Sequence, residues 1–247
     1  MASNTSPVYQ KEFFGVQLAL AQEIAEIEHK TLDQVVLRYT AFYRMFGLDW
    51  SFDPTNAVWE TYIDGLRLAT DPVQYTHEYY LERYPSIPTS AEEQTHWGCF
   101  AYNYNTETKK IRLHFGDYDR SGYGPLSHLR IAQRKEELHA MFQHIQHNHP
   151  DALWVVGGSW LYNWESYTRL FPPSFGQTAQ AREMPSLQGR ASWNQLLRRG
   201  WCIHPASMAF FLQKVSQLEQ VEDYPGCFPY EELWTEAPIS LFYGFYI

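Results

Sequence analysis

The chain has 247 residues, a formal net charge of −9 and a hydrophobic fraction of 45%, which is enough apolar material for a sizeable core. The acidic balance argues against a nucleic-acid partner, and no apolar run approaches the roughly 20 residues that span a bilayer. Three well-separated cysteines fit free thiols in a reducing compartment. We therefore expect a cytoplasmic protein that binds a small molecule, with no membrane partner.

The first third of the chain predicts helices. Apolar residues recur at helical spacing over residues 13–27. Thr31 and Gln34 fit a capping box, and an apolar stripe over residues 32–46 predicts one helix that ends at Gly47.

Asp-Pro pairs at residues 53–54 and 71–72 each predict an N-cap with proline at the first helical position. The two helices should run to about residues 69 and 84, before prolines 85 and 88 break the chain. We expect a helical N-terminal region over residues 1–88 and an α/β core region over residues 89–247, within one compact unit.

The middle of the chain changes to strand-like periodicity. Residues 97–104 are rich in aromatic side chains and residues 109–115 alternate, so a β-hairpin with its turn at residues 105–108 is expected. In the second strand the apolar residues share one face, and Arg112 and His114 share the other.

The later elements follow in a regular order. They are a long helix from Ser127, a strand over residues 153–156, a short helix capped by Asn163, helices over residues 187–199 and 205–218, and a terminal strand over residues 239–247. The strand at 153–156 is wholly apolar, as is typical of a central strand covered on both faces. This order predicts an α/β (α+β) fold, with a central mixed sheet flanked by helices and a helical N-terminal layer.

Two glycine-marked loops follow strands and are the candidate binding elements. In the first, Gly122 and Gly124 would allow close backbone approach, the following helix would offer free N–H groups, and Arg120 or Arg130 would add charge. This combination suits an anion. The same residues would also serve as a plain connector with solvated arginines.

Acid–base chemistry is the second candidate feature. His114 lies close in sequence to Asp117 and Asp119, and a histidine beside carboxylates can act as a general base. The spacing is no standard metal-ligand set, so no metal site is predicted, and the aspartates have a second interpretation as turn residues. Tyr162 follows the second loop and could donate to a ligand. We expect His114, Asp117, Arg120 and Tyr162 to line one pocket at one sheet edge.

The order of hairpin, glycine loop, long helix, central strand and asparagine-led helix resembles the GCN5-related N-acyltransferase family over about residues 97–175. In that family, backbone N–H groups of an Arg/Gln-x-x-Gly-x-Gly/Ala turn hold the pyrophosphate of acyl-CoA. Arg120-Ser-Gly122-Tyr-Gly124 is similar to that turn and one residue shorter. The family's Asn-x-x-Ala is matched by Asn163-Trp-Glu-Ser166.

The resemblance implies an acyl-CoA-dependent N-acyltransferase that acts on a small-molecule or peptide amine, with direct attack of the amine on the thioester. The residues implied to hold acyl-CoA are Arg120, Gly122, Gly124, Arg130 and Asn163. The residues implied to handle protons are His114 or Tyr162, and Asp117 and Asp119 complete the candidate catalytic set.

Two other classes of function remain open at this point. The first is a hydrolase or transferase for an anionic or phosphorylated small molecule, which would use the polar cluster from Arg112 to Arg120. A serine hydrolase has little support, because the residues after Ser159 depart from the G-x-S-x-G pattern. The second class is a non-enzymatic protein whose aromatic pocket recognises a ligand or a peptide.

Overall fold

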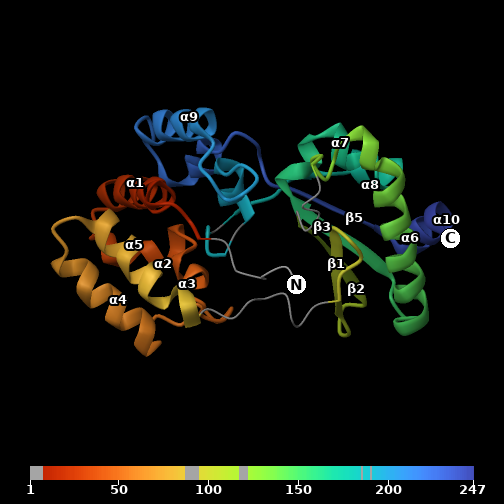
Figure 1. Cartoon of the computed structure of the whole chain (residues 1–247), viewed down its shortest axis with the longest axis horizontal. Coiled ribbons are helices and arrows are strands. Elements are labelled where there is room, and N and C mark those ends of the chain that lie inside the picture. The colour runs from red at the N-terminus through yellow and green to blue at the C-terminus, as the bar shows by residue number, and fades with distance from the viewer. Residues whose placement is uncertain (1–7, 87–94, 117–121, 185, 190) are drawn as a thin grey trace. The chain divides into compact units, whose positions relative to one another are not determined.

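The computed structural model describes residues 8–86, 95–116, 122–184, 186–189 and 191–247. Its contacts divide the chain into two compact units, which Figure 1 shows as ribbons. Unit 1 comprises Met1–Thr89 and Met184–Tyr230, and unit 2 comprises Ser90–Glu183 and Glu231–Ile247. Residues 184–230, which the sequence analysis places with the α/β region, join the N-terminal helices because their apolar side chains belong to the same buried cluster.

Unit 1 is built from helices. They are α1 (Lys11–Ile27), α2 (Leu32–Tyr39), α3 (Phe42–Met45), α4 (Ala57–Leu68), α5 (Pro72–Arg83), α9 (Pro205–Val215) and the 3₁₀ turns η1 (Tyr84–Ser86), η5 (Ala191–Leu196) and η6 (Val221–Cys227). The expected helix over residues 187–199 is thus only the short turn η5. Among the described residues, no helix has both the length and the apolar character that a membrane crossing requires.

Two predicted helix starts are confirmed in unit 1. The capping box is formed, since the Thr31 amide donates to Gln34 Oε1 at 3.0 Å. At the start of α5, the Asp71 carboxylate accepts from the amides of Val73 and Gln74 at 3.0 and 2.9 Å, with a proline at the first helical position. Both capping interactions join residues at most three positions apart, so the local sequence is sufficient to specify these helix starts.

The single helix expected over residues 32–46 is wrong, because the chain breaks between α2 and α3. Thr40 turns to an extended backbone, and its hydroxyl bonds back to the Val36 carbonyl at 2.6 Å. The Ala41 amide then donates to the side chain of Gln17 at 2.8 Å. This buried glutamine on α1 replaces the lost helical bond, so tertiary structure overrides the continuous apolar stripe.

The predicted start of α4 at residues 53–54 is also wrong. Asn56 is the N-cap and accepts from the Val58 amide at 3.0 Å. The Asp53 carboxylate instead accepts from the Thr55 amide at 2.8 Å in a local turn.

Unit 2 contains a five-stranded mixed sheet within the described part of the chain. Its strands are β1 (Phe100–Asn105), β2 (Lys110–Phe115), β3 (Trp154–Ser159), β4 (Gln180–Ala181) and β5 (Leu233–Pro238), in the order β1-β2-β3-β5-β4. The pair β2/β3 is parallel and the other neighbours are antiparallel. The predicted hairpin and the α/β class with a central mixed sheet flanked by helices are confirmed.

Helices cover one face of this sheet, as Figure 1 shows. They are α6 (Ile131–Asn148), α7 (Glu165–Thr168), α8 (Pro173–Gln177) and α10 (Ile239–Tyr246), with the 3₁₀ turns η3 (His128–Arg130) and η4 (Trp160–Asn163). The buried cluster on this side contains Ile111, Leu113, Val155, Phe142 and Phe242. We call this side the helix face and the opposite side the open face.

The expectation that the third strand is covered on both faces is wrong. Leu153 precedes the strand and is 58% exposed, and Trp154 on the open face is 37% exposed. Val155 is fully buried on the helix face. The apolar run is therefore one-sided, because its outward members lie against solvent.

The predicted terminal strand over residues 239–247 is wrong, because this segment forms α10. Its aromatic and β-branched residues favour strands by composition. However, Ile239, Phe242, Tyr243 and Tyr246 lie at spacings of three and four and pack against the core of unit 2. The segment forms a helix because helical spacing places these four side chains on one side, where all of them pack against the core.

Candidate functional site

The strands β2 and β3 stop pairing with each other halfway along their length. Their parallel register covers Lys110–Arg112 and Trp154–Val156. Beyond it, and within the described part of the chain, Leu113–Phe115 pairs only with β1, and Gly157–Ser159 pairs only with β5. We call these two stretches the unpaired edges. Each presents main-chain donors and acceptors that have no strand partner among the described residues on the facing side, at the carboxyl ends of two parallel strands.

Two glycines in β3 bring aromatic side chains onto both faces of this unpaired edge. A Cβ on Gly157 would overlap the Tyr162 hydroxyl, so Tyr162 lies directly against the backbone on the helix face. A Cβ on Gly158 would lie 3.0 Å from three ring atoms of Trp234, so the indole lies across the strand on the open face. Both glycines are required for close approach.

The described part of the glycine turn leads directly into α6. Gly122 and Gly124 are exposed, and a Cβ on either would have no heavy atom within 4 Å. Neither has a positive φ, so nothing in the backbone or in the packing requires a glycine at these positions. The space beside each Cα, where a side chain would stand, is therefore open. Ser127 then caps η3, which continues into α6.

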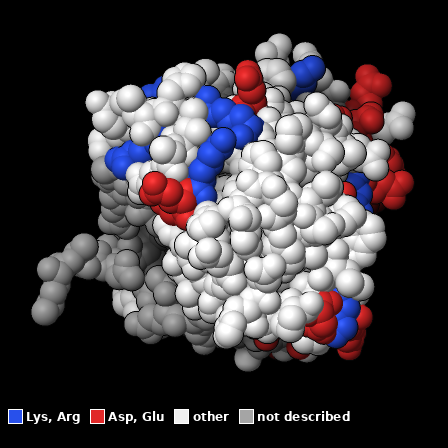
Figure 2. Space-filling model, turned by 90° about the vertical axis from the view of Figure 1, so that its right-hand side faces the viewer, with Lys and Arg blue, Asp and Glu red and all other residues white. Residues whose placement is uncertain are grey.

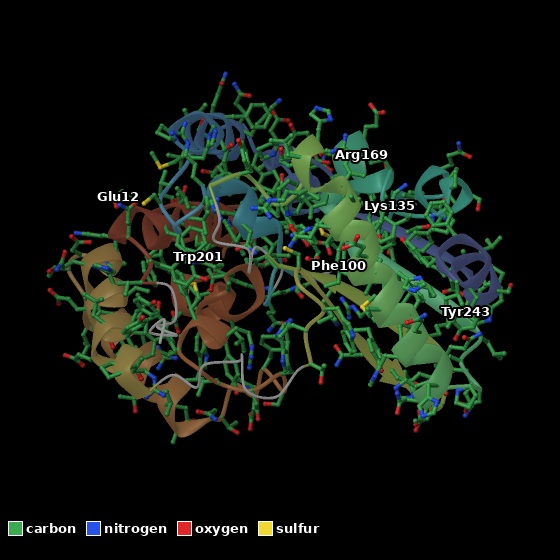
Figure 3. All side chains as sticks on the ribbon, turned by 45° about the vertical axis from the view of Figure 1, so that its right-hand side comes forward. Glu12, Phe100, Lys135, Arg169, Trp201 and Tyr243 are labelled. Carbon is green, nitrogen blue, oxygen red and sulfur yellow. The ribbon has the colours of Figure 1, made fainter. Side chains whose placement is uncertain are left out.

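Arg169 is hydrogen-bonded to the segment after this turn, and it is not among the site residues predicted from the sequence. Its Nη2 donates to the Leu126 carbonyl at 2.9 Å, and its Nη1 lies 3.1 Å from His128 Nδ1. Figure 3 shows Arg169 near the N-terminal end of α6. Its Nε is buried without a hydrogen-bond partner among the described residues. No local pattern marks Arg169, because its partners lie more than 40 positions earlier.

The predicted site residues do not all meet. Asp117, Asp119 and Arg120 lie outside the described residues. His114 projects to the open face, together with Arg112, whereas Tyr162 packs on the helix face. The prediction that His114 and Tyr162 line one pocket is therefore wrong, although both lie beside the unpaired edges. The reason is the two-residue period of β2, which turns His114 away from the core.

His114 lies next to the first strand of the hairpin. Its Nε2 is 2.5 Å from Asn103 Oδ1, on the same face of the sheet. Burial, followed by the charge of Arg112, lowers the pKa of His114 from its ordinary value of 6.5. Its imidazole is therefore neutral at pH 7, which is the form that can accept a proton.

This pKa shift predicts a pH dependence of stability. Because the folded pKa of His114 is below 6.5, the unfolded chain takes up the proton first as the pH falls. The contribution of neutral His114 to the free energy of unfolding is complete above pH 6.5. It is lost as the pH falls through the pKa that His114 has in the folded state. We expect the free energy of unfolding to fall less between pH 7 and 5 in His114→Gln than in the wild type. Histidine NMR titration with urea unfolding tests this, and a His114 pKa above 6.5 would contradict it.

The Tyr162 hydroxyl is buried. The side chain is 5% exposed, and its oxygen has no hydrogen-bond partner among the described residues. Burial, followed by the neighbouring Tyr167, raises the pKa of Tyr162 well above its ordinary value. Tyr162 therefore keeps its proton and can act as a donor, but not as a base.

Asn163 and Ser159 have structural partners. Asn163 Nδ2 donates to the carbonyls of Trp160 and Glu231 at 2.7 and 2.9 Å. The N-cap of α7 is Trp164, so the expectation that Asn163 caps this helix is wrong. Ser159 Oγ accepts from the Leu161 amide at 3.1 Å and caps η4, which explains a serine at this turn without a nucleophile.

Arg134 and Arg130 differ in position although both lie near the start of α6. Arg134 is only 1% exposed and is bonded to Glu137 and Cys99. Arg130 is half-buried and its Nη1 donates to Gln133 Oε1 at 2.6 Å. Of the two, Arg130 is the arginine that is partly exposed to solvent beside the turn.

Cys99 and Cys227 are buried free thiols, and Cys202 is an exposed one.

The side of unit 2 that carries α6 and α10 holds an open hollow of about 390 Å³, lined by Lys135, Glu136, His139, Phe245 and Tyr246. Figure 2 shows this side, whose charged side chains leave a broad uncharged area. His139 is hydrogen-bonded to the Tyr246 carbonyl, which holds the end of α10 against α6.

The described histidine, cysteine and acidic residues form no group of three or more that could hold a metal.

Searches for related proteins found no matching family model, no matching curated protein and no matching solved structure.

Proposed function

We propose that the protein is an acyl-CoA-dependent N-acyltransferase. The observation that carries the proposal is the loss of pairing between β2 and β3 after Arg112 and Val156, together with an exposed glycine turn at Gly122 and Gly124 that leads into α6. The unpaired edges lie at the carboxyl ends of two adjacent parallel strands, where ligands of α/β sheets commonly bind, and the turn follows β2 in the chain.

The unpaired edges suit an extended ligand that carries amide groups. Such a ligand can supply the hydrogen bonds that β2 and β3 do not exchange with each other over Leu113–Phe115 and Gly157–Ser159. The pantetheine arm of acyl-CoA has two amides on a flexible chain. Their N–H and C=O groups can form the same hydrogen bonds as the main chain of a short β-strand. Gly157 and Gly158 let Tyr162 and Trp234 lie directly against the two faces of β3 beside this edge.

The turn suits the pyrophosphate of the same ligand. The space beside the Cα atoms of Gly122 and Gly124 is open, so an anion can reach their N–H groups. Arg169 brings a guanidinium to the following segment, and Arg130 lies at the N-terminus of α6. Both charges favour an anion there. The residues present therefore fit acyl-CoA, and Arg120 and Asn163 stay predictions for the same role.

Bound acyl-CoA would supply a thioester carbonyl for attack by an amine. On the open face, the neutral His114 imidazole can take the proton that the attacking nitrogen loses. On the helix face, Tyr162 retains its proton, so its hydroxyl could donate a hydrogen bond to the sulfur that departs as a thiolate with the electron pair of the broken C–S bond. The two groups lie on opposite faces of the sheet, so a ligand between the unpaired edges would have one on each side.

Replacing Tyr162 with phenylalanine tests the role of its hydroxyl as a hydrogen-bond donor to the departing sulfur. The substitution removes a hydroxyl without a hydrogen-bond partner, so we expect the melting temperature to be unchanged or slightly raised. Calorimetric binding of acetyl-CoA should be retained. The kcat for CoA release, with the best amine from a screened panel, should fall roughly 100-fold.

The control is Tyr243→Phe, which removes a phenol from α10, and its kcat should equal that of the wild type. A Tyr162→Phe protein with unchanged kcat would remove Tyr162 from the mechanism. Lost acetyl-CoA binding in that variant would instead make Tyr162 a binding residue.

A further inference from the structure

Two arginines are stacked on one tryptophan of the open face. The Arg112 guanidinium carbon lies 5.3 Å from the centroid of the Trp234 ring, and that of Arg182 lies 5.2 Å from it. Arg112 comes from β2, Trp234 from β5, and Arg182 directly follows β4. Three strands thus converge on one indole, and the cation–π contacts hold both guanidinium groups beside it.

Gly158 explains how the three side chains meet. It is the register partner of Trp234, and the indole lies flat across its backbone in space that any Cβ would occupy. Arg112 can therefore reach across β3 to the ring. The result is a rigid aromatic support beside the unpaired edge of β3, with a cation from each neighbouring side.

The charge of this pair is not neutralised by the described residues. Neither Arg112 nor Arg182 makes an ion pair or side-chain hydrogen bond within the described part of the chain. Glu236 on the same face is bonded to Lys110 at 2.6 Å. Glu232 is 6% exposed and has interactions of its own. Among the described residues, two exposed guanidinium groups on this face therefore have no carboxylate partner, in a chain with net charge −9.

We propose that Arg112 and Arg182, supported by Trp234, bind the carboxylate or phosphate group of the amine that accepts the acyl group. The inference rests on the proposed acyltransferase function and names the class of its acceptor. Guanidinium groups match planar carboxylates and phosphates through paired N–H donors. His114 shares the face and lies two residues along β2, or about 6.6 Å. A small acceptor can therefore be held at its anionic end while its amine reaches His114.

The charge balance favours a small anion over a polymer. A nucleic acid needs many cationic contacts along its backbone, and the acidic chain would repel it. Arg112 and Arg182 lie 5.3 and 5.2 Å from the same ring centroid, so the two charges are gathered at one place and do not form an extended cationic track. The occupant is thus an amino acid or a phosphorylated amine of low mass.

Anion binding to the free protein tests the site without any cofactor. Phosphate and glutarate would be titrated separately, and the binding followed by calorimetry and by the NMR shift of the Trp234 indole N–H, assigned with Trp234→Phe. We expect saturable binding that Arg112→Gln and Arg182→Gln each weaken at least tenfold. Both side chains are exposed, so the variants should keep the wild-type melting temperature. Lys214→Gln, which removes a cation over Phe210 in unit 1, is the matched control and should bind as the wild type.

Gly124→Val separates this proposal from the cofactor site. It should retain phosphate and glutarate binding, because a Cβ at Gly124 has no heavy atom within 4 Å and so does not contact Arg112, Arg182 or Trp234. Anion binding that is lost in Gly124→Val and unchanged in both arginine variants would overturn the proposal, and so would an absence of saturable binding. Anion binding at the arginines in a protein that binds no acyl-CoA would keep the site and overturn its role for an acceptor.

Discussion

Replacing Gly124 with valine should abolish acyl-CoA binding and leave unit 2 folded. The residue is exposed and has no positive φ, and a Cβ added to it would meet no heavy atom within 4 Å, so valine fits without strain. Its only expected effect is to keep a pyrophosphate away from the backbone N–H groups of the turn. We expect the Kd for acetyl-CoA to rise at least about 100-fold, or roughly 2.7 kcal/mol.

Gly226→Val is the matched control for this substitution. Gly226 lies in unit 1 and also has no heavy atom within 4 Å of an added Cβ, so the change in volume is the same. Its Kd for acetyl-CoA should equal that of the wild type. Circular dichroism and thermal melting of both variants would check the fold. Wild-type affinity in Gly124→Val would show that the turn does not hold the cofactor.

Replacing Arg134 with methionine should destabilise unit 2 by about 3–5 kcal/mol, because it breaks a buried ion pair. Arg134 is 1% exposed, its Nη2 lies 3.1 Å from Glu137 Oε1, and its Nη1 is bonded to the Cys99 sulfur. Glu137 Oε2 accepts from the Cys99 amide at 3.1 Å. Arg134 and Glu137 thus join α6 to the start of the hairpin, and removal of the guanidinium leaves a carboxylate without its cation.

Urea unfolding, with hydrogen exchange of the β1 and β2 amides, would measure this loss within unit 2. Lys135→Met makes the same change in charge at the next position of α6, where the side chain is exposed, and should cost within about 0.5 kcal/mol. Equal effects of the two substitutions would show that the Arg134–Glu137 pair does not stabilise the junction.

Elements that local residue pairs specify could be predicted from the sequence. The capping box of Thr31 and Gln34 and the N-cap at Asp71 act over three residues. The hairpin turn is also local, because Asn105 Oδ1 accepts from the amides of Glu107 and Thr108. For these elements, propensity, spacing and the final structure agree.

Elements that depend on distant contacts could not be predicted. The break at Thr40 requires the Gln17 side chain, 24 residues before Ala41, to take a main-chain bond. In α10, composition favoured a strand, and only the packing of Ile239 and Phe242 against the core of unit 2 decided for a helix.

The candidate site shows the same division. The glycine turn and the outward face of His114 follow from local pattern, and both could be inferred. The register of β3 and β5, which places Trp234 over Gly158, could not. Arg182 and Arg112 are 70 positions apart and meet only on that ring. A long-range register therefore created the part of the site that the sequence did not reveal.

Calorimetric titration of the wild-type protein with acetyl-CoA and with CoA tests the central claim most directly. If the unpaired edges of β2 and β3 and the turn at Gly122 and Gly124 hold the cofactor, both compounds should bind at one site per chain. NMR shifts should then appear at the amides of Leu113–Phe115, Gly157–Ser159 and the two turn glycines. The absence of binding at about millimolar cofactor, a concentration that detects even affinities near 4.1 kcal/mol, would contradict the acyltransferase function.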